Sequence, residues 1–145
     1  MNQQKDKPVG RVLVELALAN YQDMLLAQAG TLAPDKVRQA RLPGIVDTEA
    51  TRLVLPEAVA SQLGLAAAGE TKVRYADQRT TNRPLVRDVW LKLQGRHAAF
   101  TAIVEPDRRD ALIGAIVLEE LDLVVDCATQ TLHPRDPDRI VSEIE

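Results

Sequence analysis

The chain has 145 residues, a length that fits a single domain with its own core. Apolar residues make up 46% and charged residues 27%, and this balance is typical of a globular protein rather than a disordered one. A net charge of −3, with only one Trp, two Tyr and one Phe, argues against a nucleic-acid partner, which would favour basic surfaces and stacking aromatic residues.

The composition also argues against a membrane and against export. No apolar run approaches the roughly 20 residues that a membrane-spanning helix needs. Residues 1–9 are polar, contain no apolar signal core, and are expected to form a flexible tail. The single cysteine, Cys127, excludes an internal disulfide and is typical of the reducing cytoplasm. We therefore expect a cytoplasmic protein with one domain over residues 10–137.

Short strands dominate the first part of the chain. Alternating apolar residues at 12–18 predict a strand. Turn residues follow at 20–23, and residues 24–27 are interpreted as a return strand. Residues 37–46 predict a further strand, interrupted near Pro43.

The middle of the chain predicts a helix and then a hairpin. The helix is expected over residues 56–63, because proline suits a first helical turn and Gly64 is a natural stop. Residues 72–76 and 83–86 predict two strands, and the polar residues 77–80 between them predict the turn of a hairpin.

Further short elements complete the chain. Strands are predicted near residues 89–93, 97–104, 123–126 and 131–133, helices at 116–121 and 138–145, and a solvated charged turn at 107–110. Many short strands without a regular strand–helix alternation predict a mainly β, closed or barrel-like domain with one or two short helices, followed by a helical tail at 138–145.

Most standard sites for cofactors and metals are missing from the sequence. It contains no phosphate-binding loop, no paired-glycine dinucleotide turn, no cysteine pair and no nucleophile elbow. His97 and His133 stand in separate strand-like segments, and Cys127 is interpreted as a structural thiol. We therefore expect neither a metal nor an organic cofactor.

Two apolar segments each end in a turn and are followed by a helix. In the first, Asp47 comes directly after a strand that looks buried, and small or polar residues follow at 48–50. In the second, residues 111–113 form an apolar segment that ends at Gly114. A carboxylate at the end of a strand is often only a turn or capping residue, so this pattern alone leaves the role of Asp47 open.

Taken together, the two segments make the chain resemble the retropepsin-like aspartic proteases, including their small bacterial and archaeal members. The resemblance extends over residues 10–137. It is carried by the sequence VDTEAT at 46–51 with LVLP at 53–56, and by LIGAIVLE at 112–119 with LDLVVD at 121–126. It implies an acid-protease fold and an aspartic endopeptidase that needs no cofactor. An unrelated β-sheet binding domain would require both segments to match by coincidence.

The resemblance also implies roles for single residues. Asp47 corresponds to the catalytic aspartate, and Thr48 lies beneath it with its hydroxyl bonding across a dimer axis. Leu112, Ile113 and Gly114 support the loop that carries Asp47. The family hydrolyses peptides with two facing carboxylates that share one proton. Since the chain has one such motif, the second Asp47 must come from a second copy, which implies a homodimer acting on a peptide or protein substrate.

The hairpin falls where this family places its flap, the hairpin that covers a bound substrate. The residues implied to contact substrate are those at the tip of the hairpin: Tyr75, Ala76, Asp77, Gln78 and Arg79.

The motif departs from the family pattern at one position. The family has glycine after Asp-Thr or Asp-Ser, whereas this chain has Glu49 there, followed by Ala50. Glutamate keeps the backbone amide that faces the aspartate but adds an acidic side chain next to it. Two interpretations follow: an active aspartic endopeptidase, or a catalytically silent dimeric module that binds peptides or proteins.

Overall fold

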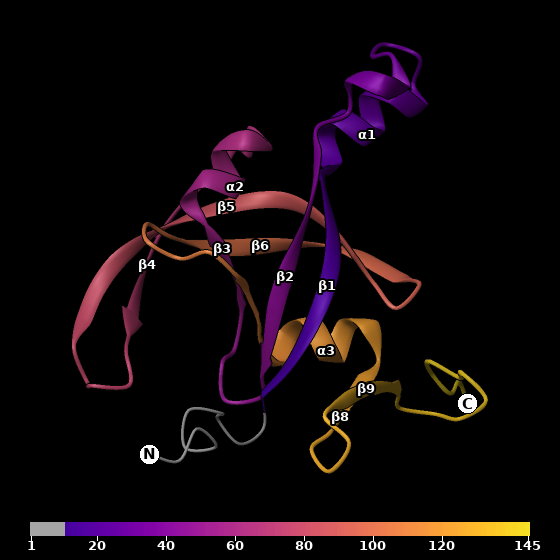
Figure 1. Cartoon of the computed structure of the whole chain (residues 1–145). Coiled ribbons are helices and arrows are strands. Elements are labelled where there is room, and N and C mark those ends of the chain that lie inside the picture. Colours follow the sequence, from indigo (N-terminus) through magenta and orange to yellow (C-terminus); the bar gives the residue numbers. More distant parts are fainter. Residues whose placement is uncertain (1–10) are drawn as a thin grey trace.

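The computed structural model describes residues 11–145 and shows a mainly β domain (Figure 1). The expected tail at 1–9 lies outside the described residues. A long antiparallel hairpin of β1 (Arg11–Asn20) and β2 (Gln39–Asp47) begins the fold, with α1 (Tyr21–Gln28) and a 3-10 helix, η2 (Pro34–Lys36), in its connection. The remaining elements are β3 (Leu53–Pro56), α2 (Glu57–Gln62), β4 (Ala67–Arg74), β5 (Thr80–Leu93), β6 (Arg96–Glu105), β7 (Ala111–Ile113), α3 (Ala115–Leu121), β8 (Leu123–Asp126) and β9 (Thr131–Pro134).

Six strands close into a mixed barrel. Their order is β1-β2-β7-β3-β6-β5, and β5 pairs back onto β1 to complete the ring. The pairs β2–β7 and β3–β6 are parallel, and the other pairs in the ring are antiparallel. β4 pairs only with β5, and the strongly curved β5 carries this hairpin to one side of the barrel (Figure 1). The predicted fold class, a mainly β and closed domain, is confirmed.

The core lies inside the barrel, and the alternating apolar residues of the strands are the ones whose side chains face it. Leu16 and Leu18 on β1 are each 1% exposed, whereas Glu15 points to solvent. Val89 and Leu91 on β5 show the same two-residue period and are fully buried. Burying one such side chain stabilises a fold by about 1.5–3 kcal/mol. The two-residue alternation of apolar side chains therefore predicts which residues form the core as well as which segments form strands.

Several local predictions are confirmed. The helices expected near 56–63 and 116–121 are α2 and α3, and the hairpin expected around residues 77–80 is the β4–β5 hairpin. The strands expected near 123–126 and 131–133 form a separate two-stranded sheet, β8–β9. No helix within residues 11–145 is long and apolar enough to span a membrane.

The return strand expected at 24–27 is wrong, because these residues belong to helix α1. Asn20 caps this helix, since its side-chain Oδ1 accepts a hydrogen bond from the backbone amide of Asp23 at 3.0 Å. The Asn20 amide nitrogen also donates to the carbonyl of Leu63 at 2.9 Å and joins α1 to the end of α2. Asparagine is common both in turns and at helix N-caps, so Asn20 by itself does not distinguish a turn from a helix start.

Two other expectations are corrected. β2 runs without interruption through Pro43, because β7 pairs with β2 only from Gly44 onward and Pro43 needs no amide on that edge. The structure shows no helix at 138–145. Val141 and Ile144 are 62% and 92% exposed, so they have no surface on which to bury an apolar helix face. A short helix without such packing is unstable in water.

The buried carboxylate of Asp23 stabilises the α1 connection through Arg38. Arg38 donates from Nε to Asp23 Oδ2 at 2.8 Å and from a terminal nitrogen to Oδ1 at 3.0 Å. The hydrogen bond from the Arg38 side chain lowers the pKa of Asp23, against the opposing effect of burial. A carboxyl group whose pKa is lowered by folding adds stability above its unfolded value, near 4, and loses it as the pH falls through the folded value.

We expect Asp23→Asn to lower the free energy of unfolding at neutral pH by about 1–3 kcal/mol, because it removes a charged acceptor from a buried pair. The difference from wild type should shrink as the pH falls from about 4 toward the lowered pKa of the folded protein, because protonation of the wild-type carboxylate then removes the charged pair. Urea unfolding across this pH range measures both effects. Asp35→Asn, which changes an exposed carboxylate on η2, is the matched control. A difference that persists unchanged in acid would contradict the charged pairing.

Candidate active site

Asp47 is the last residue of β2, a strand held from both sides. β1 pairs along one edge of β2, and β7 pairs parallel to the other edge, where Val46 lies opposite Ile113. Val46 and Ile113 are both fully buried, which fixes the end of the strand against the core. Asp47 itself is half-buried where the chain leaves the barrel. This placement agrees with the expectation that Asp47 follows a buried strand.

The turn after Asp47 folds back on its carboxylate. The backbone amide of Glu49 donates to Asp47 Oδ1 at 3.0 Å, and the amide of Ala50 donates to the Asp47 carbonyl at 3.1 Å. Glu49 does not have a positive φ, so its backbone conformation does not require glycine. Thr48 and Glu49 are exposed. Glu49, which replaces the glycine of the motif, therefore keeps the hydrogen bond from its backbone amide to the aspartate without backbone strain.

Gly114 and the first turn of α3 hold the loop at residues 48–52. The amides of Ala115 and Ile116 donate to the carbonyls of Ala50 and Thr51 at 2.8 and 2.9 Å. A Cβ atom on Gly114 would lie 2.5–2.7 Å from backbone atoms of Thr51 and Arg52, a distance that real Cβ atoms do not show. The second sequence segment is thus in direct contact with the first, and only glycine allows this approach.

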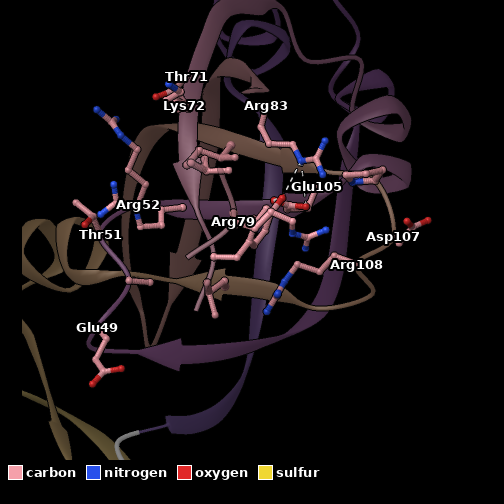
Figure 2. Close-up of a pocket in the computed structure, with 18 residues that line it drawn as sticks. Glu49, Thr51, Arg52, Thr71, Lys72, Arg79, Arg83, Glu105, Asp107 and Arg108 are labelled. Carbon is pink, nitrogen blue, oxygen red and sulfur yellow. Dashed lines mark hydrogen bonds and ion pairs between the residues drawn. The ribbon is translucent and has the colours of Figure 1, made fainter. Parts of the chain in front are cut away.

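A cavity of about 820 Å³ lies between this loop and the β4–β5 hairpin (Figure 2). Its walls are the segments 49–52, 71–75 and 105–108, together with side chains from β3, β5, β6 and β7 and with Arg79 of the hairpin turn. Leu112 lines the cavity, whereas Ile113 lies in the core. Asp47 and Thr48 do not line it and stand at its edge, next to Glu49.

The tip of the β4–β5 hairpin is a tight turn. The amide of Tyr75 donates to the Arg79 carbonyl, and the amide of Gln78 donates to the Tyr75 carbonyl, each at 2.9 Å. Gln78 has a φ of 70°, a conformation that glycine adopts more readily. Of the five residues predicted to contact substrate, Tyr75 and Arg79 line the cavity, whereas Ala76, Asp77 and Gln78 form the exposed tip.

A polar cluster that the sequence analysis missed joins this hairpin to β6. The Tyr75 hydroxyl donates to Glu105 Oε2 at 2.6 Å and accepts from Arg83 Nε at 3.0 Å, and Arg83 lies 3.3 Å from Glu105. Burial, followed by the hydrogen bond to Glu105, raises the pKa of Tyr75. The three residues are 8 to 30 positions apart and no local motif connects them, so the sequence offered no signal for the cluster.

The two histidines and the cysteine do not line the cavity. His97 packs on Trp90 with ring centroids 5.5 Å apart, and His133 lies 3.7 Å from Asp126 on the β8–β9 sheet. Cys127 is exposed. Within residues 11–145 there is no group of three or more His, Cys, Asp or Glu side chains that could hold a metal ion.

A comparison with protein-family models agrees with the resemblance drawn from the sequence. A family model described as aspartyl protease matches residues 33–117, more than half of the chain. Among solved structures, the EIAV protease complexed with the inhibitor HBY-793 is similar, with 23% identity and a TM-score of 0.48. The alignment covers 56% of this chain and 77% of that chain. A comparison with curated proteins finds no match.

We expect Gly114→Ala to displace the loop at residues 48–52 and to lower the free energy of unfolding by about 1–3 kcal/mol, because the added Cβ meets backbone atoms that cannot rotate away. Hydrogen exchange at the Ala115 and Ile116 amides should become faster as their bonds to the loop weaken. Gly44→Ala is the control, because the atoms nearest to its Cβ belong to the Leu16 and Ile113 side chains and not to the backbone. Unchanged protection of both amides in Gly114→Ala would contradict the contact.

Proposed function

Because the chain belongs to the aspartyl protease family, we propose that it is an aspartic endopeptidase whose catalytic residue is Asp47. The observation that carries this proposal is the fixed position of the Asp47 carboxylate. Asp47 stands at the end of a buried strand, accepts the Glu49 amide at 3.0 Å and borders a cavity large enough for substrate side chains.

The reaction requires two such carboxylates. One unprotonated Asp47 takes a proton from a water molecule as the water oxygen attacks the carbonyl carbon of the scissile peptide. The other, protonated Asp47 donates a hydrogen bond to the carbonyl oxygen as charge develops there. The carbon–nitrogen bond then breaks, and the leaving nitrogen receives a proton from a carboxyl group. Neither a metal nor an organic cofactor takes part in these steps.

We propose that the second carboxylate comes from a second copy of the chain. A two-fold axis close to Asp47 would bring two identical loops face to face. Two exposed apolar residues near this loop support such an interface. Leu13 on β1, which pairs with Ile45 of β2, is 78% exposed. Ile116, whose amide donates a hydrogen bond to the loop, is 40% exposed. Thr48 is exposed beside Asp47, as the proposed bond of its hydroxyl across the axis requires.

A silent dimeric binding module is the second candidate function, and Glu49 is the observation that favours it. Two extra carboxylates close to the axis would disfavour a second negative charge on the Asp47 pair. In Figure 2 the Glu49 side chain lies at the margin of the cavity, with its carboxylate directed away from the other labelled side chains. This orientation supports the enzyme over the silent module.

The location and the domain limits are proposed from the sequence. Cys127 and the composition support a cytoplasmic protein, and the two motif segments support a protease domain over residues 10–137.

We expect Asp47→Asn to reduce peptidase activity by about 10³-fold or more, because asparagine keeps the shape of the side chain but cannot accept or supply the proton. Sedimentation should show a dimer for wild type and variant alike. Asp35→Asn, on the exposed η2 helix, should retain full activity. Peptide cleavage that survives in Asp47→Asn, or a wild-type protein that remains a monomer while cleaving, would overturn the proposed site.

We expect Glu49→Gly to leave kcat/KM within roughly threefold of wild type, because the Glu49 side chain points away from the cavity and the backbone amide that donates to Asp47 is retained. Glu49→Gln, which removes the charge but keeps the size, is the matched control. A gain of more than about tenfold in Glu49→Gly would identify Glu49 as the cause of a silenced site. A gain in both variants would assign the effect to its charge.

A further inference from the structure

The cavity next to the Asp47 loop is strongly basic in a protein whose net charge is −3. Its lining contains three acidic side chains, Glu49, Glu105 and Asp107. Against these stand six cationic side chains: Arg52, Lys72, Arg74, Arg79, Arg83 and Arg108. Such a local excess of positive charge in a concave site attracts anionic ligands.

The acidic side chains do not cancel this charge inside the cavity. Glu105 already binds Arg83 at 3.3 Å and accepts the Tyr75 hydroxyl at 2.6 Å, so it offsets one cation only. Glu49 and Asp107 lie at opposite margins of the cavity, and their carboxylates are directed outward (Figure 2). The net charge that a ligand meets is therefore carried by the remaining arginines and the lysine.

Several of these cations have unused hydrogen-bonding capacity. Arg108 uses its Nε to donate to the Asp110 carbonyl at 2.7 Å, which leaves the terminal nitrogens of its guanidinium group. Arg79 stacks on the Tyr75 ring at 4.9 Å, and its Asp77 partner lies 3.7 Å away in an exposed pair. Arg52 has no carboxylate within ion-pair distance in the described part of the chain.

The cavity also provides an apolar surface for the stem of a side chain. Val54, Ile103 and Leu112 line it between the charged groups, and they belong to the three neighbouring strands β3, β6 and β7. Figure 2 shows the guanidinium groups of Arg79, Arg83 and Arg108 gathered on one side of the cavity, around Glu105. An apolar surface with planar cationic groups beside it suits the methylene stem and the carboxylate of glutamate.

We propose that this cavity is a subsite that selects an acidic side chain of the peptide substrate, with Arg108 as its specificity-determining residue and Arg52, on the opposite side of the cavity, adding to the positive charge that the ligand meets. The inference rests on the proposed peptidase function only for its link to cleavage. Recognition of the carboxylate is a binding property of the cavity, and it can be measured without any turnover.

The test uses full-length Asp47→Asn protein and fluorescein-labelled peptides. Each peptide carries one glutamate at a different position of an otherwise neutral sequence and is compared with its glutamine counterpart by fluorescence anisotropy. We expect one glutamate position to tighten binding by about three- to tenfold over glutamine, the range for a charge-assisted contact in a partly exposed site. The preference should weaken as the salt concentration rises.

Variants in the Asp47→Asn background assign the effect to the cavity. Arg108→Gln should remove most of the preference for glutamate. Arg52→Gln should weaken this preference without disturbing the 105–110 turn, because Arg52 has no carboxylate partner in residues 11–145. Arg109→Gln makes the same charge change next to Arg108 but outside the cavity lining, and should keep the preference. Equal binding of glutamate and glutamine peptides, no peptide binding at all, or equal losses in the Arg108 and Arg109 variants would overturn the proposal.

The outcomes separate this proposal from the proposed function. Glutamate-selective binding by Asp47→Asn, with no cleavage of any peptide by wild type, would support the subsite and reject the peptidase. Cleavage by wild type without a glutamate preference in binding would support the peptidase and reject the subsite.

Discussion

The site depends on the insertion of a three-residue strand, β7, between β2 and β3. β7 pairs parallel to β2 and antiparallel to β3, and it completes the barrel at the place where the chain leaves β2 as Asp47. The residue that follows β7 is Gly114, whose lack of a side chain lets the 48–52 loop pass against it. The backbone bonds from Ala115 and Ile116 then fix that loop. One contact thus positions the carboxylate, the loop and the floor of the cavity.

A second set of contacts determines the shape and charge of the cavity. The β4–β5 hairpin has no partner strand beyond β4, so its position relative to the barrel depends on the curvature of β5 and on side-chain contacts. Tyr75 reaches Glu105 at the end of β6, and Arg83 bonds to both. This cluster fixes the hairpin against the barrel, and it pairs Glu105, the one carboxylate directed into the cavity, with Arg83 and Tyr75. The same interaction that orders the hairpin therefore leaves the cavity basic.

Local patterns in the sequence predicted the elements close to the site well. Proline before α2 and glycine after it marked that helix, and period-two alternation marked the strands. Local signals are misleading where two of them conflict. Asn20 was interpreted as a turn residue although it caps α1, and the apolar residues at 140–144 resembled a helix face but have no surface to pack against. Capping and packing depend on what the rest of the chain supplies, so short segments are ambiguous.

The sequence by itself determined the β class, the hairpin and the family, because alternation, turn residues and the two motif segments are properties of neighbouring residues. It also singled out Asp47 and Gly114, although the contact between the loop and Gly114 is visible only in the fold. Only the tertiary structure decided the parallel β2–β7 pair and the basic cavity. The partners in both come from segments dozens of residues apart, and their charges add up only after the barrel has closed around them.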